Sequence, residues 1–210
     1  MNNIPMLILS CILAYLLGSV SSGILVSKIA KGPDLRTVGS KNTGASNVQR
    51  TMGWKYGLIT FFADALKGVL SCLIAELVTG DHMAALPAGL CCVIGHNWPV
   101  FFGFKGGKGV ATTVGVMLYC FPIPALFCVA GTVALIAAFR YISLGSLFMV
   151  VSFAIASIFF SNGNLWIILW ACTLMIMCVI RHRANIVRLL KGTENKLGNH
   201  SQINGGTHEQ

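Results

Sequence analysis

Seven apolar segments, separated by short polar or proline-containing stretches, constrain this chain more than any other feature of its sequence. They cover residues 4–27, 56–78, 84–102, 110–121, 124–138, 142–160 and 165–180. A helix needs about 20 apolar residues to cross the hydrocarbon core of a bilayer. Only 10% of the residues are charged, too few to cover a water-facing surface, since soluble domains carry about 25%. The sequence therefore predicts an all-α integral membrane protein, a single bundle of about seven transmembrane helices.

The fourth and fifth apolar segments are short for a full crossing. They meet at the sequence FPIP, residues 121–124, where proline stops a helix. Two arrangements fit this pattern, a pair of tilted spans or a re-entrant hairpin. Both return the chain to the side of the membrane that it left.

The distribution of positive charge predicts the orientation of the bundle. With the N-terminus outside and the C-terminus in the cytoplasm, fourteen of the fifteen Lys and Arg fall on the cytoplasmic side, and the exception is Lys67 inside the second segment. Cytoplasmic loops of membrane proteins carry this excess of Lys and Arg. The net charge of +9 is thereby explained by topology, and no nucleic-acid partner is predicted. We expect one membrane domain over residues 1–192 and a polar, disordered cytoplasmic tail over residues 193–210.

This orientation places three polar segments together on the cytoplasmic side. The first covers residues 32–55 and is too polar and glycine-rich to span a membrane. Hydroxyls, amides, a glycine that permits close backbone approach and a fixed positive charge are the groups that bind a phosphate without a metal. Here they are Ser40, Asn42, Gly44, Ser46, Asn47 and Arg50. The alternative is a solvated loop whose cations only set the orientation.

The second polar segment is GHNWPVFFGFKGGKGVATT, residues 95–113. Gly106 and Gly107 can expose backbone amides, Lys105 and Lys108 add charge, and a helix is expected to begin just beyond them. The pattern is no Walker A motif, and spacing alone does not separate a phosphate cradle from a basic turn. His96 in the same segment either packs in the membrane or accepts a proton from a substrate hydroxyl.

The third polar segment, residues 181–194, has the spacing of a helix that lies on the inner membrane surface. That interpretation leaves Asn185 and Glu194 unexplained, and we expect Glu194 to fold back and orient a lysine or a substrate hydroxyl. Asp64 and Lys67 lie three residues apart inside the second apolar segment, hence on one helical face. Charges at that depth are expected to pair with each other or with a ligand.

Taken together, the three segments resemble a known family. The sequences GSVSSG and VGSKNTGASNVQRTMG, then GHNWPVFFGFKGGKGVATT, then HRANIVRLLKGTE are similar in order and spacing to the three motifs of the bacterial PlsY family, the acyl-phosphate:glycerol-3-phosphate acyltransferases. The resemblance runs from Gly18 to Glu194. The first motif diverges, because Ser21, Lys41, Thr43 and Ser46 stand where the family usually has proline, glycine, isoleucine and threonine.

The resemblance implies a reaction and a location. A fatty acyl group is expected to pass from acyl phosphate to the 1-hydroxyl of sn-glycerol 3-phosphate, giving lysophosphatidic acid and phosphate. It implies no cofactor, no metal and no obligatory protein partner, and an active site facing the cytoplasm at the bacterial inner membrane, in contact with membrane lipid. The expected catalytic residues are His96, Lys108, Asn185 and Glu194. The expected substrate-binding residues are Ser40, Asn42, Gly44, Ser46, Asn47, Arg50, Asp64, Lys67, Lys105, Gly106, Gly107 and His182.

Two other functions compete with an enzyme. A transporter or channel for a phosphate-bearing anion would share the basic, glycine-rich segments, but it needs access from both faces and often contains an inverted repeat, which is not visible here. A structural protein that binds anionic lipid would not need Asn42, Ser46, His96 or Asn185. No GxSxG or Cys–His signature is present, so no protein nucleophile is predicted.

Overall fold

The structure, a computed structural model, describes residues 4–198, whose regular secondary structure consists of helices with no strands. Among these residues, five helical stretches are long and apolar enough to cross a membrane, and a sixth crosses if its bent halves count as one. The stretches are α1 (Ile4–Ser19) with α2 (Ser22–Ile29), α4 (Trp54–Thr79), η1 (His82–Ala84) with α5 (Ala85–Asn97) and η2 (Val100–Phe102), α7 (Pro122–Phe139) and α8 (Ile142–Phe160). The sixth joins α9 (Leu165–Arg181) to α10 (Arg183–Leu190) across a bend of 64°.

Two further helices are too short to qualify as spans by themselves, α3 (Ala45–Met52) and α6 (Val110–Cys120). The fourth apolar segment forms α6, whose 11 residues reach only about 16 Å, roughly half of a bilayer core. Residues 111–117 of α6 are all buried, so its apolar side chains face protein rather than lipid. A count of apolar segments cannot make this distinction. Five or six helical stretches qualify as spans by length and composition, and the expected count of about seven stays a prediction.

The first and fifth helices approach each other closely. A Cβ added at Gly18 in α1 would collide with the backbone of Cys92 in α5, and one at Gly95 would collide with the carbonyl of Tyr15. Glycines that let backbones touch are typical of helix pairs in membranes. This contact fixes the C-terminal end of α5, which carries His96, against the point where α1 ends.

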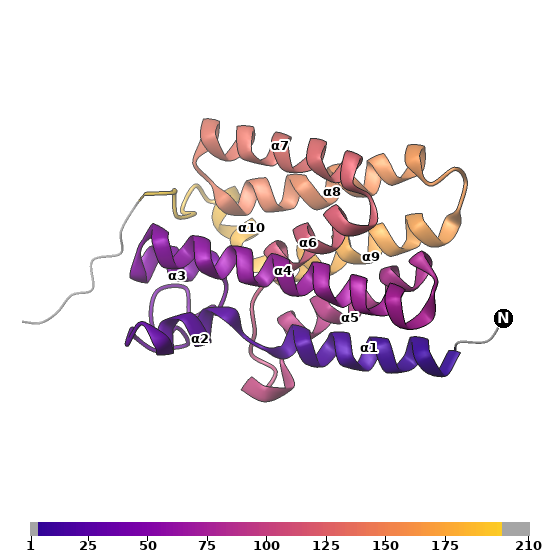
Figure 1. Ribbon diagram of the computed structural model, residues 1–210. Coiled ribbons are helices and arrows are strands. Elements are labelled where there is room, and N and C mark those ends of the chain that lie inside the picture. Colours follow the sequence, from indigo (N-terminus) through magenta and orange to yellow (C-terminus); the bar gives the residue numbers. More distant parts are fainter. Residues whose placement is uncertain (1–3, 199–210) are drawn as a thin grey trace, which may run out of the picture.

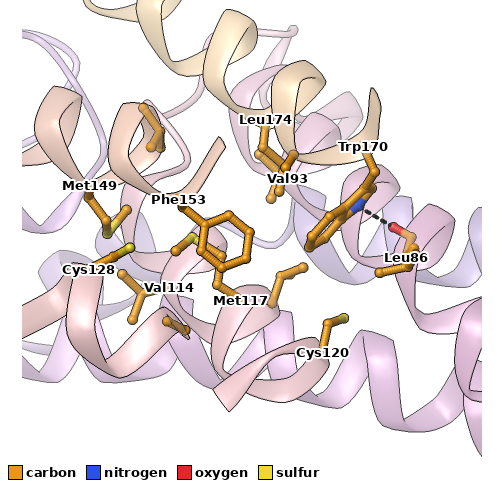
Figure 2. Packing of buried hydrophobic residues seen from close by; sticks show 14 of the residues in the cluster. Leu86, Val93, Val114, Met117, Cys120, Cys128, Met149, Phe153, Trp170 and Leu174 are labelled. Atoms are coloured by element: carbon orange, nitrogen blue, oxygen red, sulfur yellow. Dashed lines mark hydrogen bonds between the residues drawn. The ribbon is translucent and has the colours of Figure 1, made fainter. Parts of the chain in front are cut away.

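The core lies around α6 and joins it to α5, α8 and α9. Met117 contacts a cluster that includes Phe153 and Trp170, and these three side chains are buried (Figure 2). The indole N–H of Trp170 donates to the carbonyl of Leu86 at 2.9 Å. This bond satisfies the one polar group of a buried tryptophan and fixes α9 against α5.

The polar segments gather at one end of the bundle. Figure 1 shows α2, α3 and α10 at this end and the first residue of α1 at the other. The charge distribution predicted this separation of the polar segments from the N-terminal end. The glycine at position 192, with φ +68°, ends the chain's last helical stretch and turns it back toward the bundle.

The first residues of the expected tail belong to the fold. In residues 193–198, here called the strap, the Leu197 amide donates to the carbonyl of Arg140 at 2.6 Å. The Arg140 guanidinium donates in return to the Leu197 carbonyl at 2.7 Å. The prediction of disorder from residue 193 is therefore wrong for the strap, because composition does not register these long-range bonds. Residues 199–210 lie outside the described residues.

Candidate functional site

A cavity of about 230 Å³ opens at the polar end of the bundle. Twelve of the sixteen predicted site residues line it, and they come from all three polar segments and from α4. They are Ser40, Asn42, Gly44, Ser46, Asn47, Arg50, Asp64, His96, Lys108, His182, Asn185 and Glu194. The other four, Lys67, Lys105, Gly106 and Gly107, lie outside this cavity. Arg50, Lys108 and Asn185 thus meet in one place although they are far apart in the sequence.

Two helix N-termini face the cavity. Residues 44–46, at the start of α3, and residues 109–111, at the start of α6, both line it. The first amides of a helix have no partner within the helix, and together with the helix dipole they attract anions. With Arg50 and Lys108 alongside, this part of the cavity is built to hold negatively charged oxygens.

A chain of polar contacts runs from Lys108 to the strap. The Lys108 ammonium donates to Asn185 Oδ1, and Asn185 Nδ2 donates to Glu194 Oε1 at 2.7 Å. Glu194 Oε2 accepts from Arg188 at 2.8 Å. Glu194 therefore folds back as predicted and orients a lysine, acting through Asn185. Burial lowers the pKa of Lys108 to about 8, with opposing contributions from Glu194 and Arg188.

A second buried network reaches the cavity from α4. Lys67 Nζ lies 2.9 Å from Asp64 Oδ1, and it also donates to the carbonyls of Gly18 and Val20 at 2.9 and 2.8 Å. These carbonyls lie at the break between α1 and α2, where helical partners are missing. Asp64 Oδ1 lies 3.4 Å from His96 Nδ1. The expected Asp64–Lys67 pair is present, and Lys67 uses its donors within the protein.

In the glycine-rich loop, residues 105–109, the backbone amide of Gly107 is not free to bind a phosphate, contrary to what had been expected from the sequence. This amide donates to the His96 carbonyl at 3.0 Å, which corrects the prediction that it faces a phosphate. Arg181 donates to the carbonyls of both Gly106 and Gly107, the shortest bond being 2.6 Å to Gly107. A Cβ at Gly107 would collide with the His96 ring. The backbone of Gly106 and Gly107 is therefore held between His96 and Arg181.

The loop before α3 is organised by two asparagines. Asn47 is buried, and its amide donates to the carbonyls of Leu35 and Val38 while its oxygen accepts from the Ser40 amide at 2.8 Å. Asn42 accepts from the Gly44 amide at 2.9 Å and lies within 3.5 Å of the Gly106 carbonyl. Asn47 shapes this loop from within, because its polar atoms already have partners. Asn42 connects it to the glycine-rich loop.

His182 follows a different pattern from His96. Its ring is buried, and Nδ1 lies 2.9 Å from the Cys178 carbonyl, which can only accept a hydrogen bond. Nδ1 is therefore the protonated nitrogen when the ring is neutral, and Nε2 is left as an acceptor. His182 lines the cavity, so a substrate hydroxyl or phosphate O–H is a suitable partner for it.

Sequence reasoning missed two parts of the cavity wall. Ser143 is 6% exposed, and its hydroxyl has no partner among the described residues. It lies within an apolar segment and carries no recognisable motif. Residues 195–198 of the strap also line the cavity, which composition had assigned to a tail. Most of the apolar wall comes from α7 and α8, with Val129, Val133, Ile136, Ile142 and Met149.

Comparisons with known proteins show which family this chain resembles. The family model described as glycerol-3-phosphate acyltransferase matches residues 8–192. A glycerol-3-phosphate acyltransferase of Alkaliphilus metalliredigens is 41% identical over 196 residues, which cover 93% of this chain and 98% of that protein. One of Aquifex aeolicus is 44% identical over 186 residues, covering 88% of this chain and 96% of that protein.

Two crystal structures of PlsY, an integral membrane glycerol 3-phosphate acyltransferase, are also similar. The glycerol 3-phosphate form has a TM-score of 0.85 and 42% sequence identity, and the match covers 91% of this chain and 96% of that one. The lysophosphatidic acid form has a TM-score of 0.83 and 41% identity, with 91% and 95% covered.

Proposed function

Because the chain belongs to the glycerol-3-phosphate acyltransferase family, we propose that it transfers a fatty acyl group from acyl phosphate to the 1-hydroxyl of sn-glycerol 3-phosphate. The products are lysophosphatidic acid and inorganic phosphate, and the reaction takes place at the cytoplasmic face of a bacterial inner membrane. The observation that carries this proposal is the cavity itself. Its lining divides into a polar part, with Arg50, Lys108 and two helix N-termini, and a largely apolar part that comes mainly from α7 and α8.

This division suits the two proposed substrates. Glycerol 3-phosphate and the head of acyl phosphate both carry phosphate, whereas the acyl chain needs an apolar environment. We assign the phosphates to Arg50, Lys108, Ser40, Ser46 and the amides that begin α3 and α6. Asn42 positions the loops around them. The acyl chain lies along α7 and α8. A nearby lipid-facing surface is consistent with a donor that arrives from the membrane.

The proposed chemistry needs no covalent intermediate with the protein. The 1-hydroxyl oxygen attacks the acyl carbonyl carbon, an ester bond forms, and the bond from that carbon to the phosphate oxygen breaks. Lys108 and the α6 amides stabilise the negative charge on the carbonyl oxygen and on the departing phosphate. Asn185 and Glu194 hold Lys108 in place. Most of the acceleration then comes from orientation and charge stabilisation.

The hydroxyl proton has two predicted acceptors, His96 and the phosphate of the substrate. The ring of His96 has Asp64 near Nδ1 and the Gly107 backbone against Nε2. This crowding favours the phosphate as the acceptor and a positioning role for His96 beneath the glycine-rich loop. The variant His96→Gln is expected to keep turnover within about tenfold, since loss of a general base costs about 10²–10⁴-fold. A steady-state assay in which turnover falls a thousandfold, with the fold intact, would restore His96 as the base.

One assay tests the whole proposal. Purified protein in neutral detergent is given acyl phosphate and labelled glycerol 3-phosphate, and lysophosphatidic acid is separated from the substrate by extraction. Formation of labelled lipid that depends on acyl phosphate is the expected result. Protein in sealed vesicles that moves labelled glycerol 3-phosphate across the bilayer without acylating it would instead support the transporter.

The pH dependence of the acyl-transfer activity should follow the protonation of Lys108. Its pKa of about 8 means that the ammonium is charged below this pH and loses its charge as the pH rises through it. The rate of acyl transfer, measured as kcat/KM, is therefore expected to fall above pH 8. Bound dianion favours the charged lysine, so the fall in kcat should come at a higher pH than the fall in kcat/KM.

The variant Lys108→Arg provides the control for this profile. Arginine stays charged throughout the accessible range, so its remaining activity should lack the alkaline fall. The exposed Lys55→Arg should keep the profile of the unmodified protein. An alkaline fall of the same midpoint in Lys108→Arg would assign the titration to another group.

A further inference from the structure

A second cleft lies beside the cavity and is strongly basic. It is lined by Arg36, Ser40, Lys41, Asn42, Phe104, Lys105, Gly106 and Arg181. Four of these eight residues are cations, and no Asp or Glu is among them. Such a concentration of positive charge attracts anions and raises their local concentration.

The four cationic side chains differ in whether they already have partners within the protein. Arg36 is paired with Asp34 at 2.8 Å, and Arg181 is held by the Gly106 and Gly107 carbonyls. Those carbonyls are uncharged, so Arg181 keeps its full positive charge within the cleft. Lys41 and Lys105 are exposed and have no hydrogen bond or ion pair from their side chains within residues 4–198. Two ammonium groups are thus available to a ligand from solution.

The cleft adjoins the cavity. Ser40 and Asn42 line both, and the glycine-rich loop has Lys105 on the cleft side and Lys108 on the cavity side. The wall between them contains Asn42 and Gly106, which lie within 3.5 Å of each other. An anion in the cleft is therefore separated from the phosphate-binding end of the cavity by only one layer of polar residues.

We propose that this cleft is a separate binding site for small phosphate anions, through which they pass to or from the cavity. It rests on the proposed function, since that reaction consumes one phosphate monoester from the cytoplasm, glycerol 3-phosphate, and releases another phosphate species, inorganic phosphate. The four cations hold the anion by charge and hydrogen bonds, and Lys41 and Lys105 supply the mobile donors. Lys105, predicted to bind substrate in the cavity, acts in this second site.

The test is the double variant Lys41→Gln/Lys105→Gln in neutral detergent. Its matched control is Lys28→Gln/Lys55→Gln, which removes two exposed lysines that line neither space. In the cleft variant, KM for glycerol 3-phosphate should rise about fivefold or more, kcat should change less, and kcat/KM should depend less on salt. These results identify the incoming substrate as the ligand.

Product inhibition separates the two sources of phosphate. Weaker inhibition by inorganic phosphate, with KM for glycerol 3-phosphate unchanged, identifies the leaving phosphate and also supports the site. Equal behaviour of the cleft and control variants overturns it. An effect that appears only in vesicles of anionic lipid, and is absent in neutral detergent, overturns it as well, because the lysines then serve lipid head groups.

A binding measurement keeps this test independent of turnover. Calorimetric titration of the purified protein with inorganic phosphate at fixed ionic strength should give two classes of site, of which the cleft variant loses one. If the unmodified protein makes no lysophosphatidic acid but the cleft variant still loses one class of phosphate site, the proposed reaction is contradicted. The proposal that the cleft binds phosphate then stands. A single class of site, identical in both variants, contradicts the cleft alone.

Discussion

Replacement of Lys108 by methionine is expected to lower kcat/KM for acyl transfer by about a thousandfold. Removal of one donor that stabilises a developing oxyanion costs about 10²–10³ in rate, and Lys108 also carries charge that methionine lacks. Lys108 is half-buried, lines the cavity and lies just before the start of α6.

The loss should appear mostly in kcat. Lys108 is proposed to act on the charge that develops on the carbonyl oxygen and the leaving phosphate, and interactions made only in the transition state alter kcat. The variant also leaves Asn185 Oδ1 without its donor. Measurement of both kcat and KM for each substrate separates this expectation from a simple loss of phosphate affinity.

Two controls accompany this variant. Lys191→Met removes an exposed lysine at the end of α10 and should leave kcat within twofold. Thermal unfolding of Lys108→Met should show a modest fall at most, since one unsatisfied acceptor at Asn185 costs about 1–3 kcal/mol, and the protein should remain folded in the assay. A folded Lys108→Met protein that retains a tenth of the activity contradicts the assignment of Lys108 to catalysis.

The sequence predicted the composition of the cavity better than its internal bonding. Positive-inside topology places residues 32–55, 95–113 and 181–194 on one side, and any compact bundle must then bring them near one another. Arg50, Lys108 and Asn185 converge for this reason. The same rule carries no information on which atom faces a ligand.

The direction of the glycine-rich loop illustrates this limit. GGKG is compatible with amides that face a phosphate, and the Gly107 amide instead bonds to the His96 carbonyl. The loop is also held by Arg181, which lies more than seventy residues away in the sequence. Its guanidinium donates hydrogen bonds to the carbonyls of Gly106 and Gly107. A basic residue at a membrane boundary predicts orientation first, so this second role was not visible.

Length and polarity likewise carry little information about the surroundings of α6 and of the strap. An apolar segment reads as a span whether its side chains meet lipid or protein, and those of α6 meet protein. A polar segment reads as a tail unless its backbone finds partners. Leu197 finds them in Arg140, at the junction of α7 and α8. Both cases depend on tertiary contacts that local composition does not contain.

The buried pair on α4 leads to the largest expected change in stability. Lys67→Met leaves the Asp64 carboxylate in the membrane interior with only His96 near it, and it removes the donor from the carbonyls of Gly18 and Val20. Loss of one partner of a buried ion pair costs about 3–5 kcal/mol. We therefore expect a large fall in the unfolding temperature, together with loss of activity because the break between α1 and α2 loses the donor that holds its carbonyls.

The eight free cysteines allow the unfolding temperature to be measured in detergent. Five of them are buried, Cys72, Cys92, Cys120, Cys128 and Cys178, so a thiol-reactive fluorophore should report unfolding as the temperature rises. Comparison at one scan rate is needed, because membrane proteins seldom unfold reversibly. Lys191→Met again serves as the control, with an expected midpoint equal to that of the unmodified protein.

The double variant Asp64→Asn/Lys67→Met decides between an ion pair and a substrate contact. Neutralising Asp64 removes the uncompensated charge, so the double variant should be more stable than Lys67→Met alone. Recovery should be partial, because the Gly18 and Val20 carbonyls still lack a donor and each unsatisfied buried group costs about 1–3 kcal/mol. If Lys67 instead binds substrate, as the sequence predicted, Lys67→Met would raise KM for a phosphate-bearing substrate while the unfolding midpoint stayed in place. Lys67 lies outside the cavity with its donors engaged by Asp64 and by the two carbonyls, and this arrangement favours the fall in stability.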